Sequence, residues 1–93
     1  QVLCLIKPQF EAGKDKVGKK GVVRDPAVHE EVLQNFISLA KSLDFTIRNL
    51  TFSPVKGPEG NIEFLAHLSM QPGEDSYLAP GDLVAQAHAA LKG

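Results

Sequence analysis

The chain has 93 residues, of which 43% are apolar and 23% charged, the size and composition of one small folded domain. Ten Lys and Arg residues stand against eleven Asp and Glu residues, so the net charge of −1 excludes a basic tail. The single cysteine, Cys4, excludes an internal disulfide framework and indicates a reducing compartment, so we expect a cytoplasmic location. No apolar run approaches the roughly 18 residues that a membrane-spanning helix needs.

The first element is a continuously apolar run from Val2 to Ile6, which predicts a strand covered on both faces, as in a parallel sheet. Pro8 cannot donate to a strand ladder, so pairing should stop there. Because the chain opens with Gln1 directly before this strand, we expect a fragment of a larger protein. Folded alone, the piece would expose one flank of the strand and would tend to self-associate through that edge.

A long connection, residues 9–25, follows and is rich in glycine and lysine. Within it, residues 14–24 hold five basic residues against one acid, Asp15, a local excess of four positive charges. Glycines let the backbone approach a ligand closely, so this stretch suits contact with a phosphate backbone, and a solvated loop is the alternative. The basic residues are Lys14, Lys16, Lys19, Lys20 and Arg24.

A helix is predicted to begin at Asp25 and Pro26, with Asp25 as the N-cap and Pro26 at the first helical position. Apolar residues at three- and four-residue spacing extend it to about Leu43, and Asp44 takes the position after the helix. The stripe consists of Val28, Val32, Phe36, Ile37, Leu39, Ala40 and Leu43.

The rest of the chain predicts two strands and one helix. Residues 45–52 are rich in β-formers, residues 53–60 form a turn-rich loop, and a third strand runs from Asn61 to about Ser69. With so short a connection, the third strand returns antiparallel to the second. Residues 71–80 are irregular, and a last helix begins near Asp82.

This topology brings Lys7 and Glu63 together. In open α/β sheets, ligands bind outside the carboxyl ends of the parallel strands. Lys7 follows the first strand, and an antiparallel third strand begins on that same edge, near Glu63. A lysine oriented by a carboxylate can act as a general base or hold a hydroxyl group. The alternative is a solvated lysine at a strand end and a glutamate on an exposed strand face.

Isolated histidines and the cysteine give weaker signals. We expect His29 on the surface of the first helical turn, His67 as a structural residue of a strand, and His88 without a metal-binding partner. Cys4 should be an inert buried thiol. The sequence offers no Ser/His/Asp arrangement and no metal-ligand set.

Three motifs stand out along the chain: Leu5-Ile6-Lys7-Pro8-Gln9-Phe10-Glu11, Val17-Gly18-Lys19-Lys20-Gly21-Val22-Val23-Arg24-Asp25, and Ser53-Pro54 with Gly57-Pro58-Glu59-Gly60-Asn61-Ile62-Glu63. In this order and spacing, they resemble the TlyA/haemolysin A family of FtsJ-like ribosomal-RNA 2′-O-methyltransferases. The resemblance implies that residues 1–93 are the C-terminal half of a Rossmann-like α/β methyltransferase sheet, with three strands and two helices. In that fold the last strand inserts antiparallel between the other two.

The resemblance also implies a reaction, in which a methyl group passes from S-adenosylmethionine to a ribose 2′-hydroxyl of ribosomal RNA. Lys7 falls on the lysine that handles the hydroxyl and Glu63 on the acid that orients it. The other catalytic residues, the glycine-rich cofactor loop and an S4 RNA-binding domain would precede Gln1. We therefore expect no cofactor-binding residue here and no activity of the fragment alone, with Lys14–Arg24 and Lys56 as an RNA-facing patch.

Two other functions are considered. The chain could be a non-catalytic module that contacts RNA or self-associates. The family's name also suggests a membrane-active haemolysin, but neither predicted helix has a basic face opposite a large aromatic one.

Overall fold

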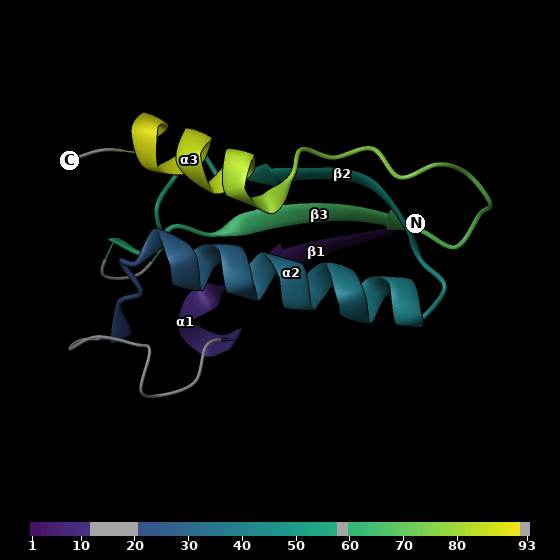
Figure 1. Cartoon of the computed structure of the whole chain (residues 1–93), viewed down its shortest axis with the longest axis horizontal. Coiled ribbons are helices and arrows are strands. Elements are labelled where there is room, and N and C mark those ends of the chain that lie inside the picture. Colours follow the sequence, from purple (N-terminus) through teal and green to yellow (C-terminus); the bar gives the residue numbers. More distant parts are fainter. Residues whose placement is uncertain (12–20, 58–59, 92–93) are drawn as a thin grey trace.

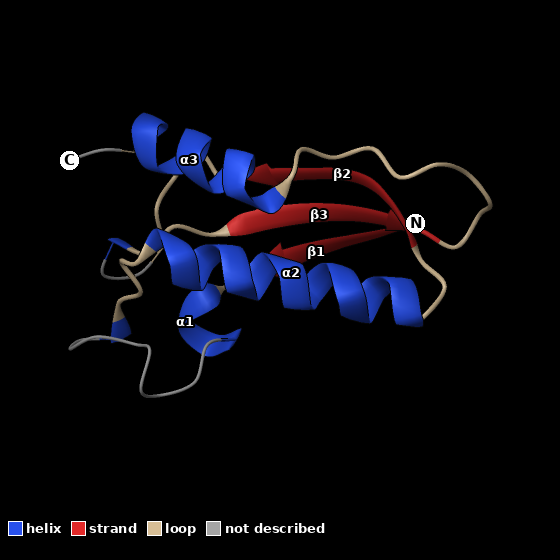
Figure 2. Cartoon of the chain, viewed as in Figure 1, coloured by secondary structure: helices blue, strands red, loops and turns tan. Residues whose placement is uncertain are grey.

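A computed structural model describes residues 1–11, 21–57 and 60–91 of the chain. It contains a three-stranded sheet with helices packed on one face (Figures 1 and 2). The elements in chain order are β1 (Val2–Ile6), α1 (Pro8–Glu11), α2 (Pro26–Ser42), β2 (Thr46–Phe52), β3 (Phe64–Ser69) and α3 (Pro80–Ala90).

Strand β3 lies between β1 and β2 and runs antiparallel to both, which confirms the predicted topology. Phe64 is paired with Ile6 on one side and with Phe52 on the other. Strands β1 and β2 are therefore parallel, and their carboxyl ends meet the beginning of β3 at one edge of the sheet (Figure 1). We call this the carboxyl edge.

The element boundaries differ from the prediction in three places. A third, short helix, α1, occupies the start of the long connection, because Pro8 takes its first position, where a missing N–H costs nothing. Strand β3 begins at Phe64 instead of Asn61, since the Asn61 side chain bonds backbone groups of another segment. Helix α3 begins at Pro80, two residues before Asp82.

The predicted start and end of α2 are confirmed. The Oδ1 atom of Asp25 accepts a hydrogen bond from the backbone N–H of Ala27 over 2.9 Å, and Pro26 is the first helical residue. After the helix, Asp44 adopts the left-handed conformation, with a φ of 64°. That turn leads the chain directly into β2.

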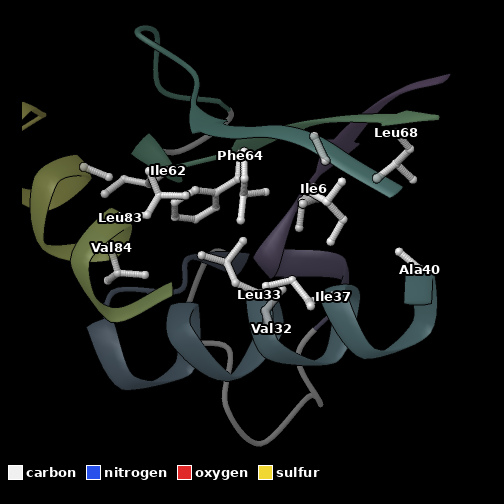
Figure 3. Packing of buried hydrophobic residues seen from close by; sticks show 14 residues of the cluster. Ile6, Val32, Leu33, Ile37, Ala40, Ile62, Phe64, Leu68, Leu83 and Val84 are labelled. Carbon is white, nitrogen blue, oxygen red and sulfur yellow. The ribbon is translucent and has the colours of Figure 1, made fainter. Parts of the chain in front are cut away.

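The apolar core lies between the sheet and helices α2 and α3 (Figure 3). On the opposite face, the Leu3 and Leu5 side chains of β1 are 74% and 49% exposed. The prediction that β1 is covered on both faces is therefore wrong for this chain, because the helices pack on one face of the sheet only, and Cys4 is half-buried instead of buried. The expected uncovered flank is present, since β1 lies at the side of the sheet with one neighbour, β3. The labelled core residues are Ile6, Val32, Leu33, Ile37, Ala40, Ile62, Phe64, Leu68, Leu83 and Val84.

Within residues 1–11, 21–57 and 60–91, no helix has both the length and the apolar character needed to cross a membrane.

Candidate functional site

Lys7 and Glu63 face each other across the carboxyl edge. The antiparallel register of β1 and β3 ends with Ile6 opposite Phe64, and the next residue on each side of that pair is Lys7 and Glu63. The carbonyl of Glu63 also accepts a hydrogen bond from the N–H of Ser53 over 2.8 Å. The backbone of Glu63 is therefore fixed between the ends of β1 and β2.

The Glu63 side chain is buried, with 7% of its surface exposed. Its Oε2 atom accepts a hydrogen bond from Nε2 of Gln9 over 3.0 Å. On the other side, the carboxylate occupies the space that a Cβ atom on Gly57 would need. The alternative of a glutamate on an exposed strand face is therefore wrong, because this carboxylate is enclosed by α1 and by the loop that precedes β3.

Lys7 is half-buried and links β1 to α1. Its carbonyl accepts hydrogen bonds from the N–H groups of Phe10 and Glu11 over 2.9 and 3.1 Å. Its Nζ atom lies 5.8 Å from the centroid of the Phe10 ring, within the range of a cation–π contact. The described residues show no ion pair between Lys7 and Glu63, so the amine and the carboxylate share an edge but are held by different neighbours.

Gln9 is a member of this site that the sequence analysis did not single out. Its Nε2 atom holds Glu63, while its Oε1 atom is buried and has no hydrogen-bond partner within the described residues. A buried amide oxygen without a partner is costly, and such atoms are found where a ligand or another part of a protein supplies a donor. Only its position after the Lys7-Pro8 pair, at the start of α1, could have drawn attention to it.

The predicted RNA-facing residues are described only in part. Arg24 and Lys56 line one cavity of about 260 Å³ beside the carboxyl edge, although they lie far apart in the sequence. Lys14, Lys16, Lys19 and Lys20 fall outside the described residues.

His29 is a correction to the sequence analysis, because it is fully buried and not on the surface. Its Nε2 atom donates to the carbonyl of Val23 over 3.1 Å, so in the neutral ring Nδ1 is free to accept from Nε2 of His88 over 2.7 Å. Burial, and then the proximity of His88, lower the pKa of His29 from 6.5 to about 4, against smaller raising effects of Val23 and Asp25. His88, expected to have no partner of metal spacing, joins α3 to α2 through this bond.

In the described ranges, no group of three or more His, Cys, Asp or Glu side chains could hold a metal ion. His67, on β3, lies in hydrogen-bond contact with Gln1: Nε2 of His67 and Oε1 of Gln1 are 3.2 Å apart.

Comparison with protein families is consistent with this geometry. The family model of FtsJ-like methyltransferases matches residues 1–70, which include both strands of the Lys7 and Glu63 pair. The chain belongs to the FtsJ-like methyltransferase family. The predicted family is thus confirmed, and with it the mixed α/β fold of the chain.

Curated relatives of this FtsJ-like chain carry related names. It is 45% identical over 95 residues to a Bacillus subtilis protein named "Putative rRNA methyltransferase YqxC", an alignment that covers 97% of this chain and 34% of the relative. It is 34% identical over 90 residues to the 16S/23S rRNA (cytidine-2′-O)-methyltransferase TlyA of Mycobacterium tuberculosis, covering 97% of this chain and 33% of TlyA. The chain therefore spans about a third of the length of these relatives.

A solved structure shows the same arrangement of elements. The FtsJ-like chain superimposes on a structure described as "Putative hemolysin from Streptococcus thermophilus" with a TM-score of 0.86 and 44% sequence identity. The superposition covers 98% of this chain and 34% of the other protein.

Proposed function

We propose that this chain is the C-terminal part of an rRNA 2′-O-methyltransferase, which transfers a methyl group from S-adenosylmethionine to a ribose 2′-hydroxyl. Membership of the FtsJ-like family and the names of the relatives support methylation of rRNA. The observation that carries the assignment of residues is the position of Lys7 opposite Glu63 at the carboxyl edge.

The two side chains would have different tasks. A ribose hydroxyl is a poor nucleophile, so it needs a base and a fixed orientation before it can attack a methyl group. The amine of Lys7 would hold the hydroxyl and accept its proton. The buried carboxylate of Glu63, held by Gln9, would orient the Lys7 ammonium from across the sheet edge.

The cavity beside the carboxyl edge does not fit S-adenosylmethionine itself, which supplies an electrophilic methyl group on a sulfonium cation. The cavity at the carboxyl edge is lined by Arg24 and Lys56, whose positive charges would repel such a cation. We place the cofactor pocket in residues that precede Gln1 in the intact protein. The isolated chain of 93 residues is accordingly expected to be inactive.

The RNA-facing surface of this enzyme would consist of the basic residues near the site. Arg24 and Lys56 lie beside the carboxyl edge, and the glycine-rich stretch before Arg24 would add further contacts with the phosphate backbone. Its basic residues are Lys14, Lys16, Lys19 and Lys20. We propose ribosomal RNA as the partner and the cytoplasm, where ribosomes are assembled, as the location.

The test is product analysis with the intact enzyme. Ribosomal RNA and labelled S-adenosylmethionine are incubated with wild type, Glu63→Gln and the control Glu30→Gln, which alters an exposed carboxylate of α2. We expect 2′-O-methylated nucleosides from wild type and from the control, and a loss of about 10-fold or more for Glu63→Gln. RNA binding without any methyl transfer by wild type would instead support a non-catalytic RNA-contacting module.

The free edge of β1 supports a second proposal, on assembly. Leu3 and Leu5 are exposed, and an apolar cavity of about 190 Å³ lies between β1 and α2 beside Val2, Leu39 and Leu43. We propose that in the isolated chain this edge pairs with a second copy, because unpaired strand edges with apolar side chains associate. In the intact enzyme, the rest of the methyltransferase sheet would cover it.

A further inference from the structure

The cavity that contains Arg24 and Lys56 is formed by three segments that are distant in the sequence. The stretch before α2 contributes Arg24, the loop before β3 contributes Lys56, Gly60 and Ile62, and α3 contributes His88. Its volume of about 260 Å³ is below the roughly 300–1,000 Å³ of sites that take drug-sized molecules. The cavity therefore suits a small group and not a whole nucleoside.

The charged side chains that line this cavity, among the residues that the structure describes, are all positive. Arg24 and Lys56 are cationic, and no Asp or Glu side chain is among its described lining residues. Within residues 1–11, 21–57 and 60–91, neither Arg24 nor Lys56 forms an ion pair with a carboxylate. A concave site lined by unneutralised cations raises the local concentration of anions.

Arg24 is held in place by its neighbours in the chain. The N–H of Val23 donates to Oδ1 of Asn61 over 2.9 Å, and the carbonyl of Val23 accepts from Nε2 of His29 over 3.1 Å. Nδ2 of Asn61 also donates to the carbonyl of Gly21 over 2.8 Å. On its other side, Arg24 is followed by the N-cap of α2. The backbone of Arg24 is therefore fixed before any ligand arrives, which lowers the entropic cost of binding.

The loop that carries Lys56 connects the cavity with the proposed catalytic pair. The N–H of Gly57 donates to the carbonyl of Asn61 over 2.7 Å, which closes the loop. Gly57 then lies directly against the carboxylate of Glu63, while Lys56 lines the cavity. A ligand in the cavity would thus contact the same loop, at Lys56, that packs against the Glu63 carboxylate at Gly57, beside the place where a ribose would reach Lys7.

We propose that this cavity binds a phosphate group of the RNA strand whose ribose reaches Lys7 and Glu63. The positive charge of the cavity indicates that its ligand is an anion. That this anion is a phosphate of RNA rests on the proposed function. Arg24 can bind two phosphate oxygens through its planar guanidinium, and Lys56 supplies a second positive charge. The cavity would thereby fix the strand relative to the reacting hydroxyl without recognising a base.

The experiment measures binding by the intact protein of a fluorescent single-stranded oligoribonucleotide of rRNA sequence, at several salt concentrations, without cofactor. The variants are Arg24→Gln with Lys56→Gln together, and Lys56→Gln alone in case the double variant does not fold. Arg48→Gln is the matched control. Arg48 lies near the beginning of β2, at the end of the sheet opposite the carboxyl edge, beside Gly73 and Pro72. Inorganic phosphate is added as a competitor in a parallel series.

We expect the double variant to raise the Kd about 10-fold or more and Lys56→Gln to raise it less. The slope of log K against log salt should become shallower by about 0.7, the value for one phosphate of a single strand, while Arg48→Gln leaves it unchanged. An unchanged Kd and slope in Lys56→Gln and the double variant would overturn the proposal. If inorganic phosphate competes with the oligoribonucleotide but the substitutions leave the Kd for RNA unchanged, the cavity does not bind a phosphate of RNA, and the assignment to RNA would be overturned. The assay requires no methyl transfer, so it separates this proposal from the proposed reaction.

Discussion

Gln9 donates a hydrogen bond to the buried carboxylate of Glu63 over 3.0 Å, across 54 positions of the sequence. The bond joins α1, which follows β1, to the residue that precedes β3. It uses Oε2 of Glu63, so the other carboxylate oxygen is not engaged by Gln9. Gln9 is thus a positioning residue in the proposed site, since it acts through Glu63.

Gln9→Ala in the intact enzyme is expected to lower kcat by about 10- to 100-fold and to change KM little, because it removes the support of Glu63 without touching the RNA surface. Steady-state methyl transfer with rRNA measures both constants. Gln34→Ala, on the exposed surface of α2, is the control and should behave as wild type. An unchanged kcat in Gln9→Ala, with a normal melting temperature, would remove Gln9 from the site.

Gly57→Ala tests the enclosure of the carboxylate. The added Cβ would occupy the place of the Glu63 carboxylate, so the acid must move and kcat should fall by about 10-fold or more. Gly81→Ala is the control: its Cβ would meet only the flexible end of the exposed Glu30, and alanine favours a helix over glycine. Equal activities of the two variants would show that the position of Glu63 is unimportant.

The His29–His88 contact predicts a loss of stability in acid. The pKa of His29 is about 4 in the folded chain and 6.5 in the unfolded chain, so the unfolded state binds the proton first as the pH falls. The free energy of unfolding should therefore decrease from about pH 6.5 to pH 4 by at most about 3 kcal/mol, and this contribution should be constant above pH 6.5. Denaturant unfolding of the intact protein at each pH measures it.

His29→Gln is the matching variant, because an amide N–H can still donate to the carbonyl of Val23 but does not titrate. It should be less stable than wild type at neutral pH, yet lose less of its stability between pH 6.5 and 4. If the two proteins lose the same amount, His29 does not control the acid sensitivity.

The β1 edge gives a prediction about assembly. The isolated chain of 93 residues should associate at micromolar concentration, and Leu3→Lys with Leu5→Lys should make it monomeric, because charges on an edge strand oppose pairing. Light scattering after size-exclusion chromatography measures the mass. Arg48→Gln, on the strand at the other side of the sheet, should leave the association unchanged. A monomeric wild-type chain would contradict the proposed pairing.

The arrangement of the sheet could be predicted because topology follows from few facts. The continuous apolar run of β1, the Asp25–Pro26 start of α2 and the short connection before β3 imply that Lys7 and Glu63 lie at the same end of the sheet. That β3 lies directly beside β1 was implied by the family resemblance. The order and direction of strands in a sheet do not depend on the details of side-chain packing. The prediction that Lys7 and Glu63 share one end of the sheet therefore holds, although β3 begins at Phe64 and not at Asn61.

The burial of His29 was not predicted, although the sequence contained a signal. His29 lies three and four residues before Val32 and Leu33, so it continues the buried face of α2 toward its beginning. The prediction treated histidine as a polar residue of the first turn. Its partner, His88, comes from α3, and the docking of α3 beside α2 is a tertiary contact that periodicity does not reveal.

The contacts made by Gln9 and Asn61 could not be derived from the sequence. Both are side-chain hydrogen bonds between segments separated by about 40 positions or more, and no local pattern specifies such pairs. Asn61 was placed in a turn or at the start of a strand, whereas its side chain fixes the backbone around Val23.

The most direct test of the central claim is the rate of methyl transfer by the intact enzyme carrying Lys7→Ala. Lys41→Ala is the control, because Lys41 pairs with Asp75 away from the carboxyl edge. We predict that Lys7→Ala reduces kcat by about 100-fold or more, as expected for loss of a general base, while the protein stays folded and still binds RNA. Near-normal turnover by folded Lys7→Ala would contradict the assignment of Lys7 and Glu63 as the reacting pair.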